Sequence, residues 1–177
     1  KSKSRKELSI KNNEKVIVYI GRITKRKGGE LLTHLIKTNP QIKFVLIGKW
    51  IEKEIKKFES DNMIVIEKVP NDQLAKYYSS GDLVFAYHKQ GCQMGIVGAE
   101  ALSCGVPIIH TKRIAFPDSK SIIKVSDSPE EINKKIKEFF SHSQKERTNL
   151  AKGSREYAQK YLSDEFWKER YLDFFLK

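Results

Sequence analysis

The chain has 177 residues, of which 39% are hydrophobic and 32% are charged, and its formal net charge is +12. This length suits one hydrophobic core, and no apolar run approaches the roughly 20 residues that cross a bilayer, which excludes a membrane-spanning protein. The two cysteines, Cys92 and Cys104, lack the spacing of metal ligands, which favours free thiols in a reducing compartment. We therefore predict a single soluble, cytoplasmic domain.

The positive charge is spread along every expected helix, which favours a solvated surface over one binding patch. A charge of this size suits nucleic acid, an anionic membrane surface or a phosphorylated substrate. No nucleic-acid motif is recognised, so no nucleic-acid partner is expected. Residues 1–6 form the only basic cluster at a terminus. We predict that residues 1–14 are a linker or N-terminal extension and that residues 15–177 form the domain.

Six apolar runs alternate with helical patterns along the first part of the chain. They cover residues 16–20, 44–47, 63–66, 83–87, 106–110 and 122–125. Runs that are apolar throughout suit strands buried on both faces, as in a parallel sheet. Helices expected at 72–80 and 95–104 complete a strand-helix alternation. The pattern predicts an α/β fold, a Rossmann-like doubly wound parallel sheet with helices on both faces.

From Ser128 onward the pattern is helical only. Ser128 is a capping residue before Pro129, and apolar residues at Ile132 and Ile136 begin one buried face. The last stretch, residues 163–175, is rich in aromatic side chains. Such a helix is too apolar to be solvated alone, so we expect a helical C-terminal tail that packs on this domain or on a neighbour.

A basic, glycine-containing segment follows the first expected strand, at residues 21–30. Ligands of parallel sheets bind at the carboxyl ends of strands, beside helix N-termini that attract anions. Arg22 offers a planar fork of donors for phosphate oxygens, and Lys27 offers a point charge. The pattern is neither a dinucleotide fingerprint nor a P-loop. A solvated basic turn is the alternative interpretation.

Glu100 lies in the middle of a small, apolar segment, residues 95–107, that ends in Gly-Val-Pro. Burying a carboxylate is costly unless polar groups receive it, so a hydroxylated or cationic ligand is one explanation for this placement. An ordinary helix with Glu100 turned to solvent is the other.

Several motifs occur together and in a fixed order. They are Gly-Arg-x-x-x-x-Lys-Gly at 21–28, Val-Leu-Ile-Gly at 45–48, Val-Pro-Asn-Asp-Gln-Leu at 69–74, the segment 78–82, and Gly-Ile-Val-x-Ala-Glu-Ala-Leu-x-Cys-Gly-Val-Pro at 95–107. With these motifs the chain resembles the C-terminal, nucleotide-binding half of family 4 glycosyltransferases of the GT-B fold, from about residue 15 to the C-terminus.

The resemblance implies roles for five residues. In that family the arginine and lysine of the first motif hold the donor diphosphate, which implies this role for Arg22 and Lys27. The main-chain amides of Ile96 and Val97, at a helix start, would lie near the same diphosphate. The second acidic residue of the family's paired motif binds the ribose hydroxyls, and Glu100 occupies that position.

The resemblance also implies a base contact and a departure from the family pattern. Val69 matches a loop position at which the backbone meets the nucleotide base. Relatives carry a glutamate eight residues before Glu100, where this chain has a cysteine, and no acidic residue lies between Asp82 and Glu100. Candidates to contact the donor sugar are Cys92, Gln93, Met94 and Gly95.

His88 follows one expected strand and His110 ends another, and each is a candidate ligand contact or a structural residue. The resemblance implies a retaining glycosyltransferase that transfers a hexose from a UDP- or GDP-sugar without a metal or further cofactor. A second, N-terminal domain would bind the acceptor, and peripheral contact with a membrane is compatible with the basic surface. The alternative is a non-catalytic binding or interaction module that has lost transfer, because of Cys92.

Overall fold

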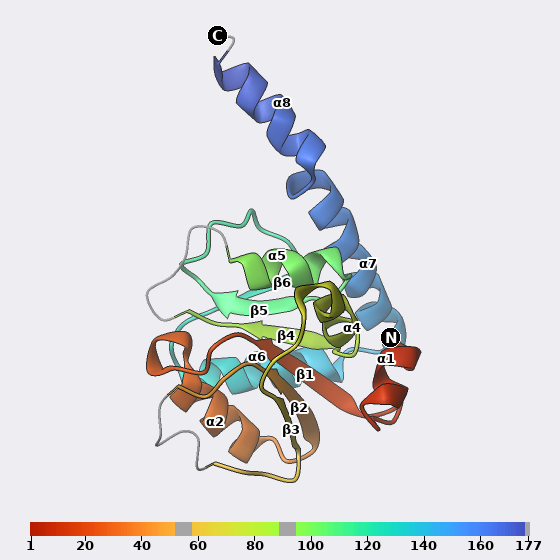
Figure 1. The fold of residues 1–177 in the computed structure, drawn as a ribbon, viewed down its shortest axis with the longest axis vertical. Helices are drawn as coiled ribbons and strands as arrows, with labels where there is room; N and C mark the ends of the chain where they lie inside the picture. Colours follow the sequence, from red (N-terminus) through yellow and green to blue (C-terminus); the bar gives the residue numbers. More distant parts are fainter. Residues whose placement is uncertain (52–57, 89–94, 176–177) are drawn as a thin grey trace.

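A six-stranded parallel sheet forms the centre of the protein in the computed structural model, which describes residues 1–51, 58–88 and 95–175 (Figure 1). The strands are β1 (Lys15–Ile20), β2 (Ile42–Ile47), β3 (Met63–Ile66), β4 (Leu83–Ala86), β5 (Ile108–Thr111) and β6 (Ile122–Val125). Their order is β3-β2-β1-β4-β5-β6, and every neighbouring pair is parallel, which confirms the predicted doubly wound sheet. The direction of winding reverses between β1 and β4, where sheets of this kind bind ligands.

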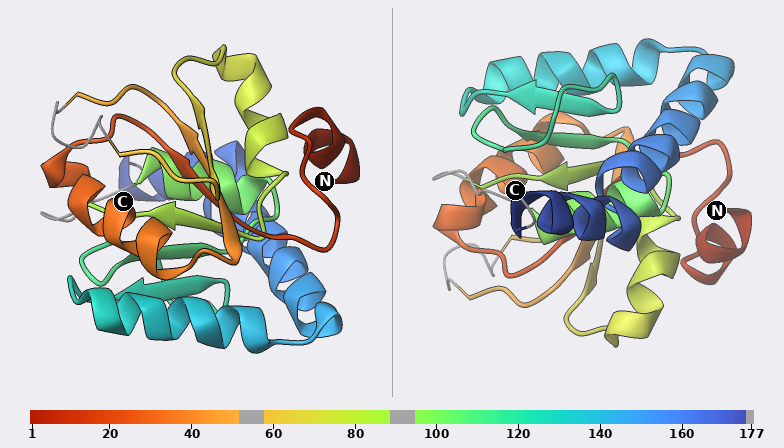
Figure 2. Two further views of the ribbon diagram at one scale, coloured as in Figure 1. Left: turned by 90° about the horizontal axis from the view of Figure 1, so that it is seen from below. Right: turned by 90° about the horizontal axis from the view of Figure 1, so that it is seen from above.

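Helices cover both faces of the sheet. The helical elements are α1 (Ser2–Glu7), η1 (Lys25–Lys27), α2 (Gly29–Thr38), η2 (Asn71–Gln73), α4 (Leu74–Tyr78), α5 (Ile96–Ser103), α6 (Pro129–Ser141), α7 (Gln144–Tyr161) and α8 (Asp164–Phe175). Helices α2 and α6 lie on one face, and α4, α5 and α7 lie on the other (Figure 2). The sheet therefore separates two hydrophobic cores.

The side chains of β1 show how one apolar run supplies both cores. Ile17 and Tyr19 belong to the core with α2 and α6, whereas Val16 and Val18 belong to the core with α5 and α7. Successive side chains of a strand point to opposite faces, so a central strand needs apolar residues at every position.

Several expected elements have different bounds in the structure. The run at 106–110 becomes a strand only from Ile108, because Pro107 has no N–H to donate to the sheet. Its carbonyl oxygen still accepts from the Val84 amide at 2.9 Å. The helix expected at 72–80 is divided into the short helices η2 and α4.

The first 14 residues are tied to the domain by Arg5, a residue of the basic N-terminal cluster. Its side chain is 2% exposed and makes an ion pair of 2.9 Å with Asp82. The guanidinium also donates to four carbonyl oxygens, at 2.9–3.3 Å, of Lys11, Asn12, Glu14 and Ser80. Asp82 in turn accepts from the amide of Val16, the second residue of β1. The segment proposed as a linker thus reaches β1 through a buried arginine.

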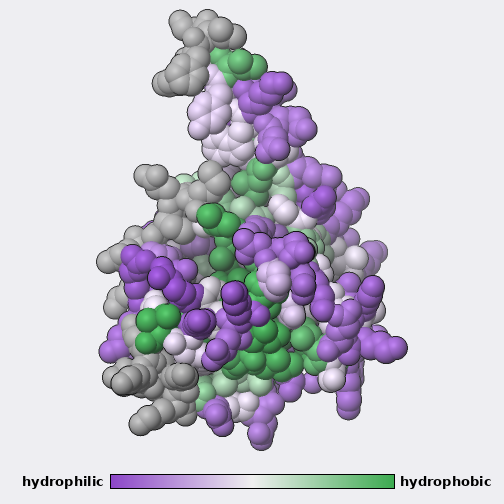
Figure 3. All heavy atoms as spheres, in the orientation of Figure 1, coloured by the Kyte–Doolittle hydropathy of each residue, from purple (hydrophilic) through white to green (hydrophobic). Residues whose placement is uncertain are grey.

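Helix α8 projects away from the rest of the domain (Figure 1). A capping box of Ser143 and Glu146 starts α7, and α8 contacts the rest of the domain through the end of α7. The side chain of Trp167 is 38% exposed, and that of Tyr171 is 62% exposed. One side of this projection shows pale aromatic surface and the other shows charged groups (Figure 3). In the described part of the chain, no helix is both long and apolar enough to span a membrane.

Candidate functional site

The turn after β1 is held rigid by its own hydrogen bonds. The Tyr19 hydroxyl donates to the Arg22 carbonyl oxygen at 2.9 Å, and the Lys27 amide donates to the Thr24 hydroxyl at 3.2 Å. An isolated parallel bridge joins Ile23 to Trp50 beyond the end of β2. Both cations predicted from the sequence, Arg22 and Lys27, therefore stand on a fixed backbone.

Gly48 allows the ends of β1 and β2 to approach closely. Its φ angle is +139°, and a Cβ atom placed on it would lie 2.1 Å from the carbonyl oxygen of Gly21. Any other residue would be strained in this conformation and would push the Gly21 backbone away. The glycine that ends the Val-Leu-Ile-Gly motif thus sets the position of the turn that carries Arg22.

The predicted diphosphate residues meet in one cavity at the carboxyl ends of β1, β4 and β5. Its volume is about 330 Å³. Among its lining residues are Arg22, Lys27, Gly95, Ile96, Val97, His88 and His110, together with Arg26, Tyr19 and Tyr87. As at any helix start, the first amides of α5 have no acceptor within the helix, so they are available to an anion. Cations and helix amides therefore face one anion-sized space.

Arg26, Tyr19 and Tyr87 were not predicted from the sequence. Tyr87 packs against the turn, because a Cβ on Gly28 would lie 2.4 Å from the Tyr87 ring. Burial, followed by the hydrogen bond from its hydroxyl to Asp127, raises the pKa of Tyr87 to about 12. Tyr87 thus connects the β1 turn to the segment after β6, a contact between distant residues for which the sequence carries no signal.

Glu100 lies one turn into α5 and does not line this cavity. Its carboxylate accepts a hydrogen bond of 2.6 Å from the hydroxyl of Tyr78, whose side chain is 1% exposed. Burial and then this hydrogen bond raise the pKa of Tyr78, so its proton stays on the hydroxyl. Tyr78 begins the segment 78–82 of the sequence motifs, but its contact with Glu100 follows only from the packing of α4 on α5.

Of the other predicted residues, Val69 follows β3 and does not line the cavity. Cys92, Gln93 and Met94 lie outside the described residues, and Gly95, the remaining donor-sugar candidate, lines the cavity. Burial, followed by the charge of Glu100, raises the pKa of the Cys104 thiol, so this cysteine is held as a neutral thiol. Within the described residues, no group of three or more metal-ligating side chains is present.

His110 is 2% exposed, and burial lowers its pKa to about 4. The unfolded chain binds this proton below about pH 6.5 and the folded chain only below about pH 4, so stability falls as the pH decreases through this window. We expect His110 to account for a loss of roughly 3 kcal/mol between pH 7 and pH 4. Urea unfolding of His110→Gln should show a shallower pH dependence, whereas His34→Gln, at an exposed position, should keep the wild-type slope.

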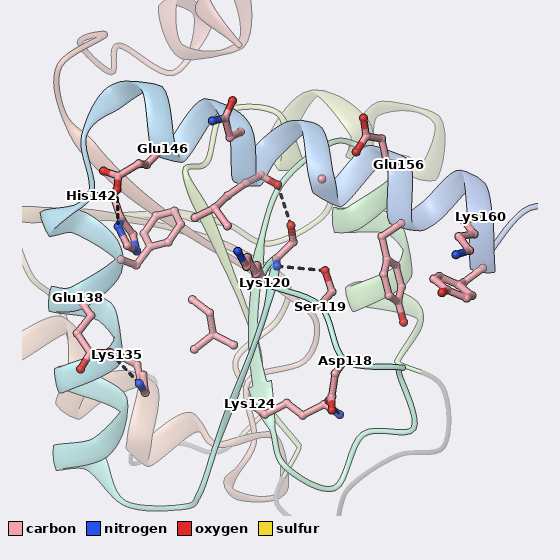
Figure 4. A pocket seen from close by; sticks show the side chains of 18 residues that line it. Asp118, Ser119, Lys120, Lys124, Lys135, Glu138, His142, Glu146, Glu156 and Lys160 are labelled. Carbon is pink, nitrogen blue, oxygen red and sulfur yellow. Dashed lines mark hydrogen bonds and ion pairs between the residues drawn. The ribbon is translucent and has the colours of Figure 1, made fainter.

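A larger cavity, of about 960 Å³, lies along the free edge of β6 between α6 and α7 (Figure 4). Among its charged groups, Lys124 pairs with Asp118 at 2.6 Å, and Lys135 pairs with Glu138 at 2.7 Å. Its floor is apolar, and it does not include the carboxyl ends of the other strands. The smaller cavity therefore remains the functional candidate.

The structure defines a doubly wound α/β domain with basic side chains in a cavity at its strand ends. Residues 1–157 match the profile of the family described as Glycosyl transferases group 1. This match covers most of the chain, and the chain belongs to that family.

The chain is similar to individual relatives in sequence and in structure. The chain is 27% identical over 131 residues to D-inositol 3-phosphate glycosyltransferase of Segniliparus rotundus, a match covering 66% of this chain and 29% of that protein. The structure is similar to sucrose-phosphate synthase from Thermosynechococcus elongatus, with a TM-score of 0.81, 21% identity, and coverage of 99% of this chain and 49% of that one. An Anabaena protein solved with UDP and glucose gives a TM-score of 0.75, 21% identity, and coverage of 90% and 47%. The chain thus spans about half or less of the length of these relatives.

Proposed function

We propose that this chain is the donor-binding domain of a retaining glycosyltransferase that transfers a hexose from a nucleotide-diphosphate sugar. The observation that carries the proposal is the convergence of Arg22, Lys27 and the start of α5 on one cavity. Family membership and the UDP named in the solved Anabaena relative support the same ligand class. The acceptor would be bound by a further domain, since the chain covers about half of its solved relatives.

Each part of the proposed ligand would lie beside particular residues of the domain. The diphosphate would lie between Arg22, Lys27 and the first amides of α5, while Glu100, held by Tyr78, would accept from the ribose hydroxyls. Val69 would meet the base through its backbone. Carboxylates that accept from vicinal hydroxyls give a compact means of recognising a sugar, and the bond from Tyr78 uses one of the two Glu100 oxygens.

The same cations would act in the transfer step. As the bond between the sugar and the diphosphate breaks, negative charge grows on the leaving phosphate oxygens. Donors that are already oriented stabilise such charge at little cost in reorganisation. Arg22, Lys27 and the α5 amides would supply this stabilisation, and we expect UDP or GDP binding to be unchanged by a metal chelator.

Calorimetry with UDP and with GDP tests the proposal. We expect Arg22→Ala to weaken binding about 10- to 100-fold, because it removes charge-assisted hydrogen bonds to phosphate. Lys25→Ala is the matched control, since Lys25 lies in the same turn, pairs with Glu30 at 3.7 Å and does not line the cavity. Absence of affinity for either diphosphate, or equal effects of the two changes, would contradict the proposal.

Tyr78→Phe should weaken UDP or GDP binding about five- to tenfold. Without the Tyr78 hydroxyl the Glu100 carboxylate loses a charge-assisted hydrogen bond that fixes its orientation. The loss should disappear with the 2′,3′-dideoxy nucleotide, which has no hydroxyls for Glu100. Tyr77→Phe is the control at the neighbouring position. Equal losses with both nucleotides would show that Tyr78 serves only the stability of the domain.

A further inference from the structure

Three aromatic residues, Tyr19, Phe85 and Tyr87, line the cavity at the strand ends, and we call them the aromatic row. The ring centroids of Tyr19 and Phe85 are 6.5 Å apart, and Phe85 and Tyr87 stack with centroids 5.8 Å apart and 10° between their planes. Each of the three residues is at most 7% exposed. Buried rings in mutual contact fix one another's orientation, so the aromatic row is a rigid part of the cavity wall.

Both hydroxyl groups of the aromatic row donate to protein partners. The Tyr19 hydroxyl donates to the Arg22 carbonyl oxygen at 2.9 Å, and the Tyr87 hydroxyl donates to Asp127. Burial raises the pKa of both hydroxyls, so each keeps its proton at neutral pH. A phenol has one O–H to donate, so neither tyrosine has a second proton for a phosphate oxygen. The aromatic row therefore acts on the protein around the cavity and not directly on an anion.

The Tyr19 hydrogen bond fixes Arg22 between two residues that are themselves tied to the end of β2. The amides of Gly21 and Ile23 donate to carbonyl oxygens at and just beyond the end of that strand, at 2.8 and 2.9 Å. Arg22 lies between them, and its carbonyl oxygen is the one that Tyr19 holds. The backbone from which the guanidinium extends is thus anchored from β2 and from the aromatic row.

The other end of the aromatic row rests on the same turn. A Cβ on Gly28, which ends η1, would lie 2.4 Å from the Tyr87 ring. The row therefore contacts the turn after β1 at both ends, which fixes the position of the Tyr19 ring relative to the turn. A guanidinium makes paired hydrogen bonds to phosphate only when its planar fork is correctly oriented, so its affinity depends on how its backbone is held.

We propose, building on the function proposed above, that Tyr19 is a positioning residue for the nucleotide diphosphate. Its hydroxyl holds the Arg22 backbone so that the guanidinium meets the phosphate oxygens, and the rings of Phe85 and Tyr87 hold Tyr19 in place. Tyr19 contributes to affinity through Arg22 and donates no hydrogen bond to the ligand.

Calorimetry with UDP and GDP tests this role in two backgrounds. Tyr19→Phe keeps the ring and removes only the hydroxyl, and it should weaken binding about three- to tenfold, the effect of one hydrogen bond. In an Arg22→Ala background the same change should alter affinity less than about twofold, because its effect passes through Arg22. Tyr157→Phe is the matched control, since the Tyr157 hydroxyl also donates to a carbonyl oxygen, that of Pro117 at 3.2 Å, and Tyr157 does not line the cavity. This control should bind as the wild type does, and urea unfolding verifies that each variant is folded under the conditions of the titration.

Three outcomes overturn the inference. Wild-type affinity in Tyr19→Phe would show that the hydroxyl does not matter for binding. An equal loss with and without Arg22 would show that Tyr19 acts on the ligand by another route, and an equal loss in Tyr157→Phe would show a general effect of removing a buried hydroxyl. The inference can fail in these ways while UDP or GDP still binds, in which case the proposed function stands. Absence of binding of both nucleotides to the wild-type protein would instead reject the proposed function itself.

Discussion

Arg5→Ala is expected to lower the free energy of unfolding by about 3–5 kcal/mol, the cost of breaking a buried ion pair from one side. The change removes the pairing with Asp82 and leaves four carbonyl oxygens without their guanidinium donor. Urea unfolding measures the loss. Hydrogen exchange of the Val16 amide should also accelerate, because Asp82 accepts from it and loses its orientation.

Lys3→Ala is the control for this prediction, since Lys3 lies on the same helix and is exposed. Its removal should change stability by less than about 0.5 kcal/mol. If Arg5→Ala and Lys3→Ala have equally small effects, the bonds of Arg5 do not hold the first 14 residues against β1 in solution.

Gly48→Ala is expected to destabilise the domain by about 3 kcal/mol or more and to weaken nucleotide binding in parallel. The φ angle of +139° is strained for alanine, and the added Cβ would lie 2.1 Å from the Gly21 carbonyl oxygen. Relief of this clash moves the β1 turn, on which Arg22 and Lys27 stand. Chemical denaturation and calorimetry with UDP and GDP measure the two effects separately.

Gly153→Ala provides the comparison, because Gly153 lies inside α7 and does not line the cavity, and an added Cβ would meet only the Ser121 hydroxyl at 3.2 Å. The gain in helix propensity offsets this tight contact, so we expect a net change within about 1 kcal/mol and unchanged binding. A Gly48→Ala variant with wild-type stability and affinity would refute the importance of the close approach between β1 and β2.

Much of the fold could be predicted because parallel strands carry a strong local signal. The apolar runs at 63–66 and 122–125 became β3 and β6 with unchanged bounds. Once the strands are parallel, their carboxyl ends share one edge, so the meeting of Arg22 and Lys27 with the start of α5 follows from the topology.

The remaining contacts could not be predicted because they join residues distant in sequence. Arg5 and Asp82 are 77 positions apart, and Tyr78 and Glu100 are 22 apart. Neither pair belongs to a local pattern such as a helix turn or a hairpin. Arg5 meets Asp82 only when α1 packs on the domain, and Tyr78 meets Glu100 only when α4 packs on α5. Arg26 illustrates a different difficulty, since two neighbouring lysines are equally basic and only the geometry of η1 decides which side chains line the cavity.

The bridge between Ile23 and Trp50 gives the domain an optical reporter. Indole emission responds to nearby charge and solvent, and Trp50 is joined by backbone pairing to the turn that carries the cavity's cations. The only other tryptophan, Trp167, lies on the projecting α8. A Trp167→Phe variant would therefore leave one tryptophan, paired with the turn that carries the cavity's cations, so that ligand occupancy can be followed in real time without an attached dye.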